Sequence, residues 1–252
     1  MITYPLFERF ESLHYLITEK DRTKPCVGSM ALHTGEASDA IRHNRRAAVA
    51  DTPFASMTIV LADQTHSDNV VCIEEAHTRG WRTLDDAVPH CDALISPLSH
   101  VALGILTADC VPILLFDPTQ RIIAAVHAGW RGSQKRIVAK TVATMQRRYG
   151  SKPSDIVAAI GPSIRGCCYE VDHNVAKHFE TIPNALQAKQ NGKWMLDLSA
   201  VNRHQLLDAG LNPAHIDIAP VCTACDTEHF FSYRAEACSG RFLSLIARTS
   251  PS

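Results

Sequence analysis

The chain contains 252 residues, 46% of them hydrophobic and 20% charged, so it can bury a substantial core and intrinsic disorder is excluded. Its net charge of −1 excludes a global field that would recruit nucleic acid or an anionic membrane, and we expect neither partner. The nine cysteines are scattered through the chain, which predicts reduced thiols. The chain shows no signal-peptide pattern and no apolar run of about 18 residues, so we expect a cytoplasmic protein.

The first half of the chain predicts short strands and one helix. Strands are expected over residues 13–18 and 27–32, and Ser38 begins a helix that carries Arg45 among several basic side chains. Residues 57–61 and 70–73 are predicted to pair as a hairpin, with His66 at the tip of the polar turn between them. Further strands are expected over 92–95 and 101–106, after a polar surface segment, 74–90.

The most informative stretch lies at the centre of the chain, from Thr107 to Gly132. Two apolar runs, 111–116 and 122–126, are separated by an Asp-Pro turn, which predicts a β-hairpin. Cys110 stands just before the first strand and His127 just after the second. Because the two open ends of a hairpin lie side by side, a thiolate and an imidazole are expected to meet at one rim of the sheet.

The remaining chain predicts alternating helices and strands. A helix is expected from Ser133, as its N-cap, to Tyr149, closed by Gly150. Further helices are expected over 173–182 and 199–209, and strands over 155–160, 215–219 and 242–247. Since no repeat or linker interrupts this order, we predict one α/β domain over residues 1–252, with mixed sheets flanked by helices.

Cysteines and histidines supply the candidate chemistry. His66, Cys110 and His127 are distant in sequence, but two imidazoles and a thiolate would suit zinc with an open fourth position, and they would also suit copper. A Cys110/His127 nucleophilic dyad is an alternative. The Cys222-Thr-Ala-Cys225 pair has neither a second CxxC nor a thioredoxin-like context, which favours a structural or incidental role.

Five motifs together resemble those of the laccase-domain family. They are Gln64-Thr-His-Ser67, Thr107-Ala-Asp-Cys110, His127-Ala-Gly-Trp-Arg-Gly132, Gly161-Pro-Ser-Ile-Arg-Gly-Cys-Cys-Tyr-Glu170 and Phe231-Ser-Tyr-Arg234. That family was first labelled multicopper polyphenol oxidase and is now assigned purine nucleoside phosphorylase activity, with adenosine deamination beside it. The resemblance extends over nearly the whole chain.

The resemblance implies a mixed α/β fold like that of cysteine-hydrolase toxins and a metal site made of His66, Cys110 and His127. It also implies that Arg234 lies near the active site. The expected function is therefore a zinc-dependent purine nucleoside phosphorylase, with copper as the other metal considered and adenosine deamination as a side activity. Its partners would be a purine nucleoside and phosphate.

On this hypothesis Cys110, His127 and Arg234 carry the reaction. Arg234, with Arg45 as a weaker candidate, would clamp the phosphate, because a guanidinium offers a forked pair of donors. Asp109 could orient a ligand or transfer a proton, and could equally serve structure.

Glu170 has the same two interpretations as Asp109.

Two other functions stay open for the chain as a whole. One is a metal-independent Cys/His hydrolase that acts on peptidoglycan precursors, and the other is a copper-dependent polyphenol oxidase.

Overall fold

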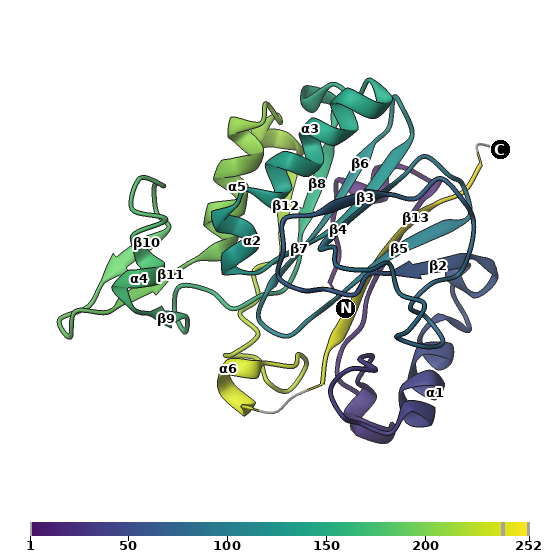
Figure 1. The fold of residues 1–252 in the computed structure, drawn as a ribbon, viewed down its shortest axis with the longest axis horizontal. Helices are drawn as coiled ribbons and strands as arrows, with labels where there is room; N and C mark the ends of the chain where they lie inside the picture. Colours follow the sequence, from purple (N-terminus) through teal and green to yellow (C-terminus); the bar gives the residue numbers. More distant parts are fainter. Residues whose placement is uncertain (1, 238–239, 251–252) are drawn as a thin grey trace.

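Two β-sheets packed against each other form the centre of the computed structural model, which describes residues 2–237 and 240–250 (Figure 1). The first sheet has the order β1-β13-β5-β2 and the second the order β12-β8-β6-β7-β4-β3. The strands of the first are β1 (Leu13–Ile17), β13 (Phe242–Arg248), β5 (Val101–Thr107) and β2 (Thr58–Leu61). Those of the second are β12 (Ile216–Ile218), β8 (Val157–Ile160), β6 (Val111–Asp117), β7 (Ile122–Ala128), β4 (Ala93–Ser96) and β3 (Val70–Cys72).

A third, small sheet lies apart from this pair, at the left of Figure 1. Its order is β10-β11-β9, and its strands are β10 (Leu186–Ala188), β11 (Trp194–Leu196) and β9 (Glu170–Val171). The sequence did not predict these strands, because each has only two or three residues and two of them flank a polar loop. Together with the two large sheets they confirm the prediction of a mixed α/β fold.

The three longest helices cover the outer faces of the two large sheets, and one short helix packs against the small sheet. The helices are α1 (Ser38–Val49), α2 (Trp130–Gln134), α3 (Ile137–Tyr149), α4 (His173–Ala176), α5 (Leu198–Asp208) and α6 (Tyr233–Glu236). Short 3-10 helices occur at Phe7–Arg9, Pro25–Gly28, Pro53–Ser56, Pro153–Asp155 and Pro213–His215. The apolar stripe of α3, with Val138 and Val142, packs on the six-stranded sheet, whereas Val49 of α1 joins a cluster with β2 and β13.

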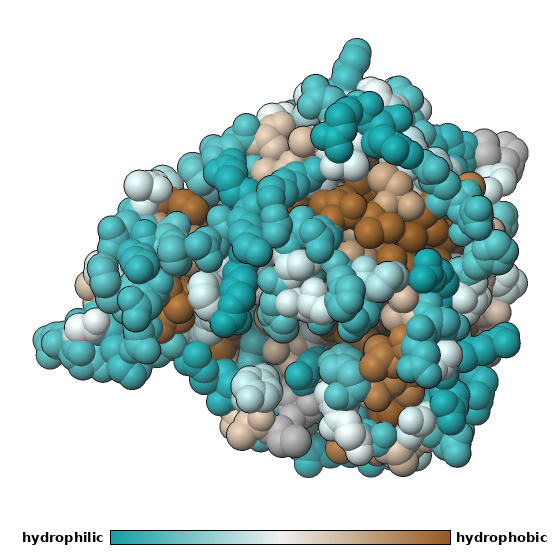
Figure 2. All heavy atoms as spheres, viewed as in Figure 1, coloured by the Kyte–Doolittle hydropathy of each residue, from teal (hydrophilic) through white to brown (hydrophobic). Residues whose placement is uncertain are grey.

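Three apolar clusters therefore hold the layers together: one between the sheets and one on the outer face of each. A space-filling view from the same side shows hydrophilic side chains over most of this face, with hydrophobic ones between them over the sheets (Figure 2). Among the described residues, no helix has both the length and the apolar character that crossing a bilayer requires.

The predicted central hairpin is confirmed. Strands β6 and β7 pair antiparallel, with Val111 opposite Ala128 and Pro112 opposite His127. All seven residues of each strand are buried, as expected for strands covered on both faces. His127 lies inside β7 and not just after it, and Cys110 immediately precedes β6.

The predicted hairpin of residues 57–61 and 70–73 is wrong. Strand β2 pairs in parallel with β5, and β3 pairs in parallel with β4 in the other sheet. The intervening polar segment, which carries His66, therefore crosses from one sheet to the other. An apolar run of four residues fits either type of pairing, so its sequence alone cannot identify the partner strand.

Three other predicted elements also differ. Residues 27–32 do not form a strand, because Cys26 and Val27 adopt left-handed backbone angles, with φ of 51° and 53°, in a 3-10 turn. The helix expected from Ser133 is interrupted at Arg136, whose φ is 60°, so Ser133 lies within α2 instead of capping a longer helix. The helix expected over 173–182 ends at Ala176, and separate turns follow it.

Candidate metal site and adjoining cavity

His66, Cys110 and His127 lie together at the rim between the two large sheets. One ligand atom from each lies within 4.8 Å of the others, and Cys110 Sγ is 3.8 Å from His66 Nε2. The topology explains the convergence, because Cys110 is on the link from β5 to β6 and His66 on the link from β2 to β3. Both links pass from the four-stranded sheet to the six-stranded sheet, beside the end of β7 that carries His127.

A buried carboxylate, Asp92, organises both histidines. Its Oδ1 accepts a hydrogen bond from His127 Nδ1 at 2.7 Å and one from the backbone N–H of His66 at 3.1 Å. Its Oδ2 accepts from the backbone N–H of Ser67 at 2.6 Å and from the Ser67 hydroxyl at 2.7 Å. Because Nδ1 of His127 is occupied by Asp92, its Nε2 is left to face the other ligand atoms.

Asp92 was not predicted from the sequence as a functional residue. Its position gave no signal, since an aspartate at the start of a short strand is common. A metal-binding histidine usually donates its second N–H to a carboxylate or a carbonyl, and this general pattern is the only signal that could have pointed to a buried aspartate near His127.

Backbone geometry also brings the three ligands close together. A Cβ at Gly129 would lie 3.0 Å from Cys110 Sγ and 3.0 Å from His66 Cδ2, so this position admits only glycine without displacing a ligand. His66 and Asp109 both have positive φ, at 57° and 87°. Such angles are unfavourable for residues with a side chain and concentrate at functional sites.

The electrostatics of the group favour a thiolate. Burial raises the pKa of Cys110, but the charge of His127 and hydrogen bonds from both histidines outweigh burial and lower the pKa below that of a free thiol. Burial lowers the pKa of His127, whereas the Cys110 thiolate and Asp92 raise it, and the net direction is upward. The thiolate is the form that both metal binding and nucleophilic attack require.

A cavity of about 420 Å³ opens beside the three ligands. This volume is typical of small-molecule sites. Among the described residues, its lining includes three arginines, Arg131, Arg234 and Arg241, and one carboxylate, Asp109. The excess of cationic side chains favours an anionic ligand.

Asp109 is held by its neighbours on both oxygens. Oδ1 accepts a hydrogen bond from Thr223 Oγ1 at 2.7 Å, and Oδ2 accepts one from the backbone N–H of Arg234 at 2.7 Å. Asp109 therefore ties the strand link that bears Cys110 to two segments near the C-terminal end. These contacts favour the structural interpretation of Asp109 over a role in proton transfer.

Arg234, which the family resemblance implies to lie near the active site, lines this cavity. Its Nη1 donates to the carbonyl of Glu170 at 2.9 Å, and its guanidinium lies 5.1 Å from the centre of the Tyr169 ring. Burial and the nearby Cys110 thiolate raise the pKa of Tyr169 to about 12, so its hydroxyl stays protonated at neutral pH. Tyr169 and Arg131 belong to motifs named above, but no role was predicted for either of them.

Arg45 lies elsewhere. Its side chain is buried, donates to the carbonyls of Met30, Gly80 and Trp81 at 2.7–2.8 Å, and does not line this cavity. These contacts favour a structural role over the substrate-binding role considered for it. The Glu170 carboxylate likewise faces away, toward Lys189 and Lys193.

Known proteins resemble this chain over most of its length. A family model described as multi-copper polyphenol oxidoreductase laccase matches residues 24–249. A Geobacillus stearothermophilus protein named purine nucleoside phosphorylase YlmD is 35% identical over 227 residues, which cover 87% of this chain and 83% of the relative. A protein named adenosine deaminase RL5, from an unknown prokaryotic organism, is 39% identical over 186 residues, covering 70% and 69%. The crystal structure of the Geobacillus YlmD aligns with a TM-score of 0.92 and 31% identity, covering 98% of this chain and 94% of that one.

Proposed function

The chain belongs to the multi-copper polyphenol oxidoreductase laccase family, and from that premise we propose that it is a zinc-dependent purine nucleoside phosphorylase acting on inosine- and adenosine-type nucleosides. The proposal rests on one observation: a His/Cys/His ligand set and three arginines converge on a single cavity. The relative named purine nucleoside phosphorylase YlmD supports the substrate class.

The residues fit a zinc ion. His66 Nε2, Cys110 Sγ and His127 Nε2 would hold it, since imidazole and thiolate are both zinc ligands and three protein ligands leave the fourth position open for catalysis. Asp92 supplies the carboxylate that orients the ligand His127. When bound, zinc would act as a Lewis acid and would lower the pKa of a bound water toward about 7.

The protein side chains would hold the two substrates. In phosphorolysis a phosphate oxygen bonds to the anomeric carbon of the sugar while the bond to the purine nitrogen breaks and its electron pair leaves with the base, which takes up a proton. Arg234, with Arg131 and Arg241 around the cavity, would bind the phosphate dianion through forked donors. The aromatic side chains of Tyr169 and Tyr233 would provide flat faces for the purine.

Dependence on phosphate tests the proposal. We expect the purified protein to release ribose 1-phosphate and hypoxanthine from inosine when phosphate is present, and neither product without it. Cleavage to free ribose at the same rate in both conditions would contradict a phosphorylase. The relative named adenosine deaminase favours adenosine as a second substrate, and deamination to inosine would need no phosphate.

Replacing Arg234 with lysine should separate substrate binding from metal binding. Arg234→Lys keeps the charge but loses the planar fork, so we expect most phosphorolysis to be lost, through a higher KM for phosphate, while zinc stays bound. Arg148→Lys is the matched control, because Arg148 is an exposed arginine paired with Glu74 outside the cavity. Wild-type kinetics in Arg234→Lys would eliminate it as a clamp, and a lowered Tm with unchanged KM would assign it a structural role.

The reactivity of Cys110 should distinguish a metal ligand from a nucleophile. Zinc neutralises a ligated thiolate, so iodoacetamide should label Cys110 slowly in the loaded protein and faster after chelation. In the chelated protein the charge of His127 and hydrogen bonds from both histidines lower the pKa of Cys110 to about 6, so labelling should slow as the pH falls through about 6. Peptide mass spectrometry reads the labelling. If Cys110 is labelled quickly at the same rate with and without the chelator, and also forms a covalent adduct with substrate, the Cys/His hydrolase would be favoured.

A further inference from the structure

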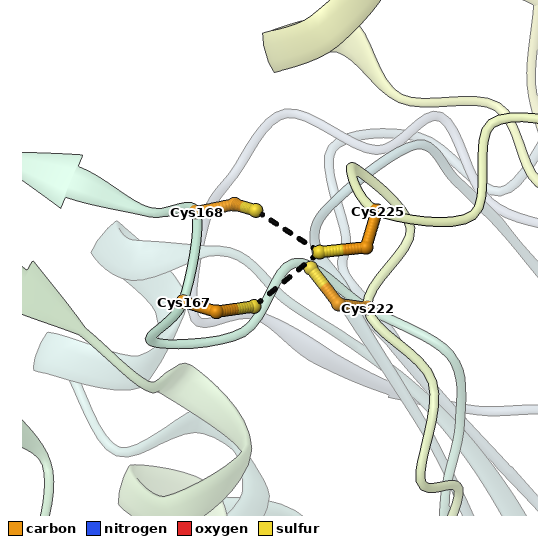
Figure 3. Close-up of side chains that lie close together, drawn as sticks. All are labelled: Cys167, Cys168, Cys222 and Cys225. Carbon is orange, nitrogen blue, oxygen red and sulfur yellow. Dashed lines mark hydrogen bonds between the residues drawn. The ribbon is translucent and has the colours of Figure 1, made fainter.

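Four cysteines outside the cavity converge at the junction of two distant segments. Cys167 and Cys168 precede β9, and Cys222 and Cys225 follow β12 (Figure 3). All four sulfur atoms lie within 4.8 Å of one another, with Cys225 Sγ 3.6 Å from that of Cys167 and 3.2 Å from that of Cys168. Their side chains point toward a common centre in Figure 3.

These spacings match a tetrahedral metal site and not a disulfide. A disulfide places two sulfurs about 2.05 Å apart, whereas zinc–thiolate bonds of about 2.3 Å in a tetrahedron separate the sulfurs by about 3.8 Å. All eight cysteines in the described part of the chain are free thiols. The separations of Cys225 Sγ from the sulfurs of Cys167 and Cys168, 3.6 and 3.2 Å, are far longer than a disulfide bond and slightly shorter than the tetrahedral value.

Apolar packing does not explain the cluster. A cysteine that merely fills a core is buried, but Cys167 and Cys225 are exposed and Cys168 is half-buried. Two tight turns direct the side chains inward: the N–H of Cys168 donates to Arg165 O, and the N–H of Cys225 donates to Cys222 O. A backbone N–H, that of Arg165, also points at Cys222 Sγ, at 3.4 Å. Donation to sulfur stabilises a thiolate.

We propose that Cys167, Cys168, Cys222 and Cys225 form a second, structural zinc site, separate from the His66/Cys110/His127 site. Four protein ligands leave no open position, which is the pattern of zinc that stabilises structure. Each thiol would release its proton to solvent as the ion binds. The ion would join the segment before β9 to the segment after β12, which already pair through Ser163 and Cys222.

The second site would stabilise two segments that contact the cavity or the residues beside it. Tyr169, which follows Cys168, lines the cavity, and Thr223, which follows Cys222, donates to Asp109 beside Cys110. A fixed crosslink at the four cysteines would therefore hold both segments in register with the first site. The inference does not depend on the phosphorylase activity, because it concerns metal content alone.

Metal analysis of matched variants tests the second site. We expect about two zinc ions per chain in the wild type purified under reducing conditions and about one in Cys167→Ser/Cys225→Ser, since two remaining thiols hold zinc poorly. Both changed side chains are exposed, so the variant should still fold. Cys26→Ser, which removes a thiol outside the cluster, should keep both ions. Equal zinc in Cys167→Ser/Cys225→Ser and Cys26→Ser would overturn the proposal.

Cobalt provides an independent readout of the ligand set. His66→Ala, loaded with cobalt alone, should show the intense visible absorption of a tetrahedral cobalt thiolate, and adding Cys167→Ser/Cys225→Ser should abolish it. Absence of that absorption in folded His66→Ala would contradict the proposal. So would a Cys168–Cys225 disulfide, found by peptide mass in protein kept under reducing conditions. Neither result depends on inosine cleavage, so failure of the phosphorylase proposal would be seen separately.

Discussion

His66→Ala should abolish phosphorolysis and empty the His/Cys/His site while leaving the fold intact. His66 is exposed, and its imidazole contacts only the other two ligands, Cys110 and His127, among the side chains of the site, so its removal costs a ligand and little stability. Loss of a supporting residue around a metal ligand weakens binding by about 10–100-fold, and loss of the ligand itself should cost at least about 100-fold. Zinc titration, inosine cleavage and the thermal midpoint Tm measure the three effects.

The matched control is His77→Ala. His77 is an exposed histidine, with 75% of its side chain accessible, and it lies outside the cavity lining. It should keep wild-type zinc content and activity. If His66→Ala also retained both, neither the metal site nor the proposed reaction at it would stand.

Asp92→Asn should weaken both the fold and the metal site. An amide at this position can still accept from His127, but its NH₂ group would face the N–H and hydroxyl of Ser67, which now donate to the carboxylate. Losing charged hydrogen bonds at a fully buried position should lower the free energy of unfolding by about 3 kcal/mol. Zinc affinity should fall by about 10–100-fold, as for other residues that orient a metal-binding histidine.

The effect of Asp92 should depend on pH in a defined direction. Burial raises its pKa, but hydrogen bonds from His127 and Ser67 outweigh burial, and the folded-state pKa is lowered. The carboxylate therefore stabilises the fold fully above the unfolded-state value of about 3.9, and this stabilisation is lost as the pH falls through the lower folded-state value. Urea unfolding of the metal-free protein at several pH values measures the difference.

Two further variants serve as controls for Asp92→Asn. Asp51→Asn changes an exposed aspartate and should alter neither stability nor zinc binding. Ser67→Ala removes the hydroxyl that donates to Asp92 and accepts from the backbone N–H of Asn69, and should cost about 1 kcal/mol. Were Asp92→Asn as stable and as zinc-rich as Asp51→Asn, the organising role of the carboxylate would be refuted.

The sequence predicted those features that depend on neighbouring residues. The β6–β7 hairpin follows from two apolar runs and a turn, and the first residue of α1 follows from the helical pattern after Ser38. The parallel pairings of β2 and β3 could not be predicted, because their partners lie more than 20 residues away and a short apolar run carries no register. The left-handed angles at Cys26 and Arg136 have no sequence signal of the kind that glycine gives.

The residues of the candidate site were also predicted only in part. His66, Cys110 and His127 were chosen by ligand chemistry and by resemblance, and the structure brings them together. Asp92 was missed because its value comes from reaching both histidines, which only the fold achieves. Likewise, Cys222 and Cys225 were predicted to be structural or incidental, because the sequence does not link them to Cys167 and Cys168, which lie more than 50 residues earlier.

The position of β13 has a consequence for synthesis on the ribosome. This strand, at Phe242–Arg248, lies between β1 and β5, although β1 is the first strand to be translated. Until β13 has left the exit tunnel, β1 and β5 each expose an unpaired edge, and such edges pair readily with other chains. The four-stranded sheet can therefore close only after residues 242–248 have been synthesised, and until then the facing edges of β1 and β5 are exposed to pairing with other chains.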